Sequence, residues 1–227
     1  MHSGANKKLL CDVAFDEIYR RVITMEYDQG QILHEKQLME ELTIGRTPIR
    51  EALHRLVARG IVATQPSSRS WTVRSITLQD IKSVFDALEI MEMGVIGLAV
   101  RHPNPDPCLS KMAAAQQDIE AAIRALDILA LVESNHRFHM AFYEACRNEY
   151  MLYGLTRIRF ETKRLAYISY SQNMGAEKSS TDHFEAVRRE HGAMMEQLRN
   201  KDADAMRRIC RTHIAAFRTR IVQYLNF

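Results

Sequence analysis

The spacing of apolar residues predicts three short helices and a small hairpin in the first third of the chain. Val13, Ile18 and Val22 lie near the 3.6-residue period of a helix. The segments that follow show the same kind of pattern, and the expected helices cover residues 13–26, 35–42 and 46–59. Gly60 ends the third helix, where a left-handed backbone is needed. Two short apolar runs around a polar turn then predict antiparallel strands, at residues 61–64 and 71–73.

From Thr77 to its end, the chain has a helical pattern throughout. Residues 77–80 resemble a capping box, with Asp in place of the usual Glu or Gln. Polar and proline-containing breaks separate six expected helices, at residues 78–101, 106–126, 127–146, 149–171, 182–199 and 203–225. The sequence therefore predicts a mainly α fold with two domains. We expect an N-terminal winged helix-turn-helix at residues 1–76 and an antiparallel all-helical bundle at residues 77–227.

The order helix, helix, three-residue turn, helix and hairpin is typical of a winged helix-turn-helix. The third helix has two distinct faces. Its apolar positions follow i, i+3, i+4 and i+7 and face the core: Ile49, Ala52, Leu53 and Leu56. The other side carries Arg46, Arg50 and His54, at i, i+4 and i+8. Arginines at the start of this helix can reach base edges or phosphates, and arginine bound to guanine is the commonest specific contact with DNA.

Charge strengthens this interpretation. The net charge of the chain is only +3. Between Arg46 and Arg74, however, there are six arginines, one acid and no lysine, a local charge of 6 − 1 = +5. Such a basic stretch favours a phosphate-binding surface, and Arg69 in the wing can lie on the DNA backbone or in the minor groove. The alternative is a solvated basic face of an ordinary helical domain.

Histidines in the helical part form a second candidate site. Asn135 and His139 are four residues apart and share a helix face. His191 and His213 lie on either side of the turn at residues 200–202, roughly 14 and 17 Å along their two helices. An antiparallel hairpin would bring both to nearly the same level. Imidazole nitrogens suit zinc, nickel, iron or manganese, and the alternative is a set of hydrogen-bonded core histidines.

Composition excludes several classes of protein. The chain is 46% hydrophobic and 26% charged, as expected of a globular protein. Its four cysteines are far apart and form no C-x-x-C pair, so we expect reduced thiols in a cytoplasmic protein. We find no signal peptide and no run of about 18 apolar residues that could span a membrane. No hydrolase, kinase or di-iron motif occurs, so we expect no enzyme. A metalloenzyme with a histidine-bound metal, or a bundle with a purely structural metal, are the other interpretations.

The stretch at residues 33–62 resembles the DNA-binding domain of the GntR family of bacterial regulators. The most specific part of the match is R-T-P-I-R-E-A-L, at residues 46–53. The resemblance implies DNA contacts by the wing tip, where Arg69 lies, and by Lys36, Arg46, Thr47 and Arg50. The chain departs from the family at Gly45, where Ser or Thr is usual. It departs again at residues 67–70, which replace a glycine-containing wing tip.

The histidine pattern is similar to the metal-binding set of the FadR-type subgroup of this family, in its FCD-domain form. The matching residues are N-x-x-x-H at 135–139, E-H at 190–191 and D-x10-H at 202–213. The resemblance implies an antiparallel bundle of six or seven helices. It also implies one divalent transition metal, zinc or nickel first, held by Asn135, His139, His191 and His213. Asn135 stands where the family usually has Asp.

The resemblance further implies a small organic-acid effector whose carboxylate completes the metal shell. Phe85 stands where the family often has an arginine that suits such a ligand. Either another cation binds the carboxylate or the ligand is less acidic. The candidates for such a cation are Arg101, Arg159 and Arg164. We expect His136 at a boundary or the surface, and His183 in a pocket wall or at the surface. The chain is thus expected to be a DNA-binding transcription regulator, a repressor and a homodimer on a palindromic operator.

Overall fold

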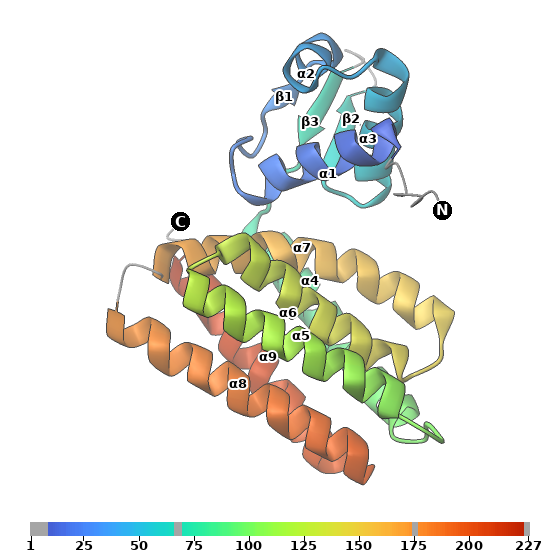
Figure 1. Ribbon diagram of the computed structural model, residues 1–227, viewed down its shortest axis with the longest axis vertical. Helices are drawn as coiled ribbons and strands as arrows, with labels where there is room; N and C mark the ends of the chain where they lie inside the picture. Colours follow the sequence, from blue (N-terminus) through green and yellow to red (C-terminus); the bar gives the residue numbers. More distant parts are fainter. Residues whose placement is uncertain (1–8, 66–69, 174–176, 225–227) are drawn as a thin grey trace, which may run out of the picture. The chain divides into compact units, whose positions relative to one another are not determined.

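The structure is a computed structural model, and it describes residues 9–65, 70–173 and 177–224. The chain divides into two compact units between Thr77 and Leu78. The first unit contains three helices and three strands (Figure 1): α1 (Leu10–Ile23), β1 (Ile32–Leu33), α2 (Glu35–Leu42), α3 (Arg46–Ala58), β2 (Val62–Gln65) and β3 (Ser70–Val73). The sheet is antiparallel, with the order β1-β3-β2. The element order and the small sheet confirm the predicted winged helix-turn-helix.

The core of the first unit forms where α3 packs against α1 and α2. The four apolar residues predicted to face inward from α3 are all fully buried: Ile49, Ala52, Leu53 and Leu56. Gly60 has a φ of 73°, which confirms the left-handed helix end. The helix α1 begins at Leu10, three residues before the predicted start. Strand β1 was not predicted, because a strand of two residues has no alternation that a sequence pattern can reveal.

The described residues of the second unit form six helices, as predicted (Figure 1): α4 (Leu78–Ala99), α5 (Asp106–Ala125), α6 (Ile128–Glu144), α7 (Glu149–Asn173), α8 (Glu177–Asn200) and α9 (Ala203–Tyr224). Helix α6 packs against α4, α5 and α7, while α9 packs against α4, α7 and α8. Among the described residues, no helix combines the length and the apolar character needed to cross a membrane.

The helix boundaries follow local capping chemistry. Leu126 adopts a left-handed φ of 54°, and the side chain of Asp127 then accepts a hydrogen bond of 2.9 Å from the backbone N–H of Ala130. This cap starts α6 and explains the break between the two helices. The break predicted at residues 175–180 is wrong for residues 177–180, because α8 already begins at Glu177. Serine has only a moderately lower helix propensity than alanine, so two serines do not by themselves prevent a helix.

The bundle core contains many polar side chains, which indicates where its function lies. Ten polar or charged residues of the second unit are buried: Glu92, Gln116, Ser134, His139, Arg159, Thr162, Lys163, Arg164, Ser169 and His191. Charged residues are rarely buried unless they are paired or bind a ligand. Most of these side chains come from the central parts of α6, α7 and α8.

Candidate functional site

The exposed side of α3 presents the residues predicted to contact DNA. Arg46, Thr47 and Arg50 are all exposed, on the side opposite the buried apolar face. Lys36 is exposed on the first turn of α2 and lies 3.9 Å from Glu40. Arg69 lies outside the described residues. All the predicted DNA-binding residues that the structure describes are therefore accessible to a DNA backbone or groove.

A groove of about 780 Å³ lies beside this surface, and the side chains of Arg46 and Arg50 line it. Glu35, on the first turn of α2, lies between the two arginines. Its carboxylate oxygens are 3.7 Å from Nε of Arg46 and 3.4 Å from Nε of Arg50. The same carboxylate accepts a hydrogen bond of 3.2 Å from Nε1 of Trp71 in β3. The carboxylate of Glu35 thus contacts both guanidinium groups of α3 and the indole group of β3.

Glu35 and Trp71 were not predicted as part of this surface. They are separated by 36 residues and lie on different elements. The edge of the His54 ring, from α3, packs against Trp71 with ring centroids 4.9 Å apart. No local spacing pattern links a residue of α2 to one of β3, so only the fold brings them together. Trp71 is the single tryptophan of the chain, which was the one available signal.

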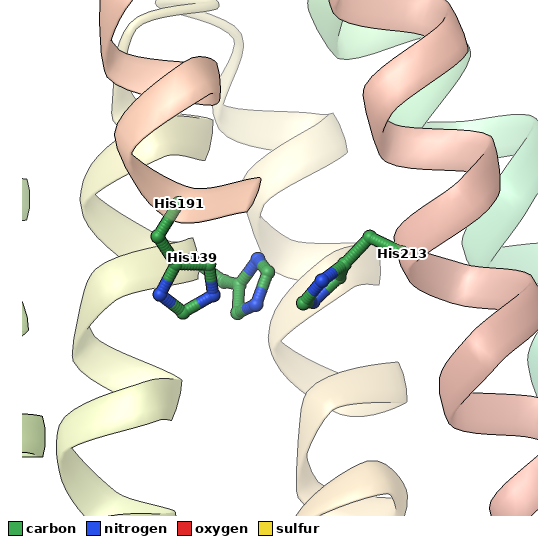
Figure 2. Close-up of side chains that lie close together, drawn as sticks. All are labelled: His139, His191 and His213. Carbon is green, nitrogen blue, oxygen red and sulfur yellow. The ribbon is translucent and has the colours of Figure 1, made fainter. Parts of the chain in front are cut away.

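The structure brings three of the four predicted metal ligands together. His139 lies on α6, His191 on α8 and His213 on α9, and Figure 2 shows their rings gathered between these helices. The ring centroids are 5.2 to 5.3 Å apart in all three pairs. One ring nitrogen from each residue lies within 4.8 Å of the other two. Donor atoms around a tetrahedral zinc are about 3.4 Å apart, so small side-chain rotations would close the set on an ion.

Neighbouring side chains contact Nδ1, the outer nitrogen, of two of these rings. Nδ1 of His213 lies 2.7 Å from a carboxylate oxygen of Glu190, and Nδ1 of His191 lies 2.8 Å from Oε1 of Gln116. A carboxylate only accepts, so Nδ1 of His213 donates, and an amide oxygen gives His191 the same tautomer. Each Nε2 then carries the lone pair that a metal requires. Phe138 stacks on His191 at 3.8 Å between ring centroids and fixes its plane.

Ring nitrogens of two of these histidines lack hydrogen-bond partners within the described part of the chain, as expected of metal ligands. Nε2 of His191 and both ring nitrogens of His139 are buried and have no hydrogen-bond partner among the described residues. Leaving such groups unsatisfied costs roughly 1–3 kcal/mol each. Burial lowers the pKa of His139 and of His191 well below the usual value, so both rings are neutral. Neutral imidazole is the form that binds metal ions, and this donor set therefore fits a divalent transition metal.

The other residues singled out from the sequence lie close to the cluster. Asn135 is one turn before His139 and lines a cavity of about 20 Å³ together with His213. His136 is part-buried at the predicted boundary position, and burial lowers its pKa to about 2. His183 is also part-buried, contacts Arg220 and stacks on Tyr170. Neither His136 nor His183 belongs to the group of three rings that face one another.

A buried charged group connects three helices next to the histidines. Arg159 of α7 is only 4% exposed. It donates from Nη2 to Glu92 of α4 and from Nε to the hydroxyl of Tyr143 of α6, both at 2.7 Å. The Tyr143 hydroxyl in turn donates to Glu92. These residues are 16 to 67 positions apart in the chain, so helical spacing could not predict their contact.

The structure ranks the three cations that the sequence left open. Arg101 is exposed in the loop after α4, and Arg164 is fully buried and lies 3.9 Å from Glu161. Arg159 alone of the three lines the described cavities next to Asn135. Phe85, in the position where arginine is common in the resembling family, is buried and packs against Phe217 with ring centroids 5.3 Å apart.

Comparisons with known proteins agree with this two-part arrangement. The model of the bacterial regulatory proteins of the gntR family matches residues 10–71, and that of the FCD domain matches residues 83–216. The gluconate operon transcriptional repressor of Bacillus licheniformis is 23% identical over 190 residues, which cover 84% of this chain and 76% of that protein. The Glc operon transcriptional activator of Escherichia coli (strain K12) is 24% identical over 170 residues, covering 66% of this chain and 65% of that protein.

Solved structures share the fold. E. coli McbR/YncC has a TM-score of 0.79 at 19% identity, covering 96% of this chain and 100% of that chain. A putative transcriptional regulator GntR from Rhodococcus sp. RHA1 has a TM-score of 0.70 at 17% identity, covering 94% and 97% of the two chains. At this level of identity the similarity shows the architecture. The sequence relatives named above are regulators of transcription, not enzymes.

Proposed function

We propose that this chain, which belongs to the GntR family of bacterial regulatory proteins and carries an FCD domain, is a repressor controlled by a small acid. In this proposal the winged helix-turn-helix binds an operator. The helical bundle holds a divalent metal ion and the effector, and effector binding lowers operator affinity. The observation that carries the proposal is the group of three facing histidines in the helical bundle, two of which have buried ring nitrogens without a partner among the described residues.

The DNA-binding part of the proposal rests on the exposed face of α3. Arg46, Thr47 and Arg50 would enter the major groove, with Lys36 on a phosphate of the backbone. Arg69, in the wing tip, would add a contact to the backbone or minor groove. The carboxylate of Glu35 supports this arrangement, because it orients both arginines in the free protein. A preoriented guanidinium loses less side-chain entropy when it binds a base.

The metal part rests on the fit of the donor set. His139, His191 and His213 would hold the ion by their inner nitrogens, with Asn135 supplying an amide oxygen from the same face of α6. Zinc or nickel suits imidazole donors best. When bound, such an ion offers open positions to an oxygen of the effector. Glu190 and Gln116 keep the outer nitrogens protonated and thereby keep the lone pairs directed inward.

A homodimer on a palindromic site completes the proposal. One winged helix reads only a few base pairs, so two-fold pairing doubles the contact with DNA. The bundle carries large exposed apolar side chains on two helices that pack together, α4 and α7. They are Ile90, Tyr150 and Tyr153, which are 73%, 92% and 81% exposed. Light scattering on the free protein and on its DNA complex tests this, and a monomer in both would contradict it.

Metal analysis combined with operator selection tests the main proposal. Protein purified without chelator, and again after addition of zinc or nickel, should contain about one ion per chain. The same protein should enrich a small set of genomic fragments with two-fold symmetry. Less than about 0.1 ion per chain in both preparations would contradict the metal site. Retention of DNA without sequence preference would contradict the operator. If metal raises the melting temperature but no acid changes operator affinity, the ion is structural.

A further inference from the structure

Two small cavities lie in the bundle beside the histidine cluster, with volumes of about 20 and 10 Å³. They share three lining residues, Asn135, Arg159 and Phe217. The first cavity also touches His213 and is therefore adjacent to the three rings. Because they share these side chains, the cavities are neighbouring lobes of one interior region.

Both lobes are lined by cations. Arg159 borders both, Arg220 borders only the first, and Lys163 borders only the second. No aspartate or glutamate among the described residues lines either lobe. The acidic partners of two of these cations lie outside the lobes: Glu92 beside Arg159, and Glu133 at 2.7 Å from Nζ of Lys163. The polar walls of both lobes therefore favour negatively charged groups.

Arg159 uses only part of its guanidinium group in hydrogen bonds to described residues. Its hydrogen bonds to described residues use Nε and Nη2, both on the side of Tyr143 and Glu92. The Nη1 hydrogens remain for a molecule in the lobes. A buried guanidinium that is held on one side and open on the other is suited to a carboxylate, because its donors match the two oxygens. The neutral amide of Asn135 adds no negative charge that would repel such a group.

We propose that the effector is a short dicarboxylic acid, with one carboxylate in each lobe. The first carboxylate would lie near Arg220 and His213, the second near Lys163, and Arg159 would bind between them. A monocarboxylic acid would satisfy one lobe and leave the cation of the other facing an apolar chain end. This inference rests on the proposed function, in which the bundle binds an acidic effector, and it names the class of acid and the residues that select it.

The size of the lobes adds a structural consequence. Together they hold about one or two water molecules, so a dicarboxylate enters only if they join and widen. Phe217 lines both lobes and is the shared apolar side chain that must move. Phe217 lies on α9 and packs against Phe85 of α4, the helix that directly follows the DNA-binding unit in the chain. Binding of the effector would therefore rearrange packing on α4, as an effector signal requires.

Calorimetric titration of the full chain tests the inference. The probes are succinate against butyrate and glutarate against valerate, which match in carbon number and differ in one carboxylate. Each is titrated into metal-loaded and into chelator-treated protein. We expect each dicarboxylate to bind metal-loaded protein at least about tenfold more tightly than its matched monocarboxylate. We expect the same order, with lower affinities, for the chelator-treated protein, because the lobe cations belong to the chain.

Variants distinguish how each lobe contributes to binding of the acid. Lys163→Gln should reduce the dicarboxylate preference to within about threefold, because the second carboxylate loses its cation. The matched control is Lys111→Gln, since Lys111 also pairs with a glutamate, Glu144, but is exposed on α5 away from the lobes. Removing Arg159 alone would leave Glu92 buried without its partner. The double variant Arg159→Gln and Glu92→Gln avoids this and should lose binding of both acid classes with its helical circular dichroism intact.

The outcomes distinguish this inference from the function it rests on. Equal affinity for both acid classes, or an unchanged preference in Lys163→Gln, overturns the dicarboxylate assignment and leaves an acid-controlled regulator in place. If no carboxylate binds to a protein that still recognises its operator, the acidic effector of the proposed function fails as well.

Discussion

The carboxylate of Glu35 accepts a hydrogen bond from the indole nitrogen of Trp71, at 3.2 Å, while lying 3.4 Å from Nε of Arg50. The first turn of α2, helix α3 and strand β3 therefore meet at one side chain. The contact favours one position of the Arg50 guanidinium beside β3. The geometry of the DNA-binding surface thus depends on residues that need not contact DNA themselves.

Trp71→Phe tests this relationship, because it keeps an aromatic ring beside His54 and removes one N–H group. Losing a hydrogen bond of about 1 kcal/mol should weaken operator binding about fivefold. The dependence of affinity on salt should not change, because no phosphate contact is removed. Fluorescence anisotropy at several salt concentrations measures both quantities. Wild-type affinity in this variant would show that Trp71 does not position the arginines.

Arg50→Ala should separate base recognition from phosphate binding. A lost bidentate base contact costs about 1–3 kcal/mol and should relax sequence preference at one position of each half-site. Lys36→Ala should instead weaken binding to all sequences and lower the salt slope by about one. Arg101→Ala serves as a control, since Arg101 is exposed but outside the DNA-binding unit. Unchanged operator affinity in Arg50→Ala, measured by gel shift, would contradict the proposed recognition surface.

His139→Leu should have opposite effects on the metal-free and the metal-loaded protein. Both ring nitrogens of His139 are buried without a described partner, so an apolar side chain of similar size removes an unsatisfied group. We expect the metal-free variant to be as stable as wild type or more stable, by up to about 2 kcal/mol. The rise in melting temperature that zinc produces in the wild type should disappear.

Differential scanning calorimetry with and without zinc checks this prediction. His136→Leu is the neighbouring control, and it should keep the zinc-dependent rise because His136 is not one of the three facing rings. A metal-free His139→Leu protein that is strongly destabilised would mean that His139 is an ordinary core residue. Full zinc binding by that variant would exclude it as a ligand.

The metal-free protein should lose stability below about pH 6.5. Burial lowers the pKa of His136 to about 2 and that of His183 to about 3, and it also lowers the pKa of His139 and of His191 well below the usual value. Below pH 6.5 the unfolded chain binds protons at these residues, whereas the folded chain does not. Stability is therefore complete above this pH and falls by about 1.4 kcal/mol per pH unit for each such histidine.

Urea unfolding between pH 7.5 and 5 measures this slope. His183→Gln should reduce it by about one proton, because it removes one buried histidine that is not among the three facing rings. A free energy of unfolding that does not change over this range would mean that the histidines accept protons in the folded state.

The sequence predicted those parts of the molecule that depend on regular spacing. The two faces of α3 and the approach of His191 and His213 followed from helical periods and from one antiparallel turn. The bundle boundaries were predicted within a few residues, except at α8, which begins at Glu177 rather than at the predicted residue 182. Contacts between distant segments could not be predicted. The pairs Glu35–Trp71 and Glu92–Arg159 exist only because separate elements pack together.

The same limit applies to the effector site. Phe85 showed that the cation expected at its position is missing. The sequence did not indicate which of three arginines replaces it. The choice of Arg159 depends on which side chains border the lobes next to Asn135, and this is a property of packing rather than of spacing.

The most direct test of the account is the affinity of the selected operator for zinc-loaded protein, measured by fluorescence anisotropy with and without saturating succinate, in wild type and in His139→Leu. The account predicts that succinate weakens operator binding by about tenfold or more in wild type. It predicts that His139→Leu, whose operator affinity without succinate should equal that of the wild type, needs at least about tenfold more succinate for the same weakening, because it lacks the metal ion. Equal responses of the two proteins to succinate, or no response of the wild type to any carboxylic acid, would contradict control of DNA binding through the histidine cluster.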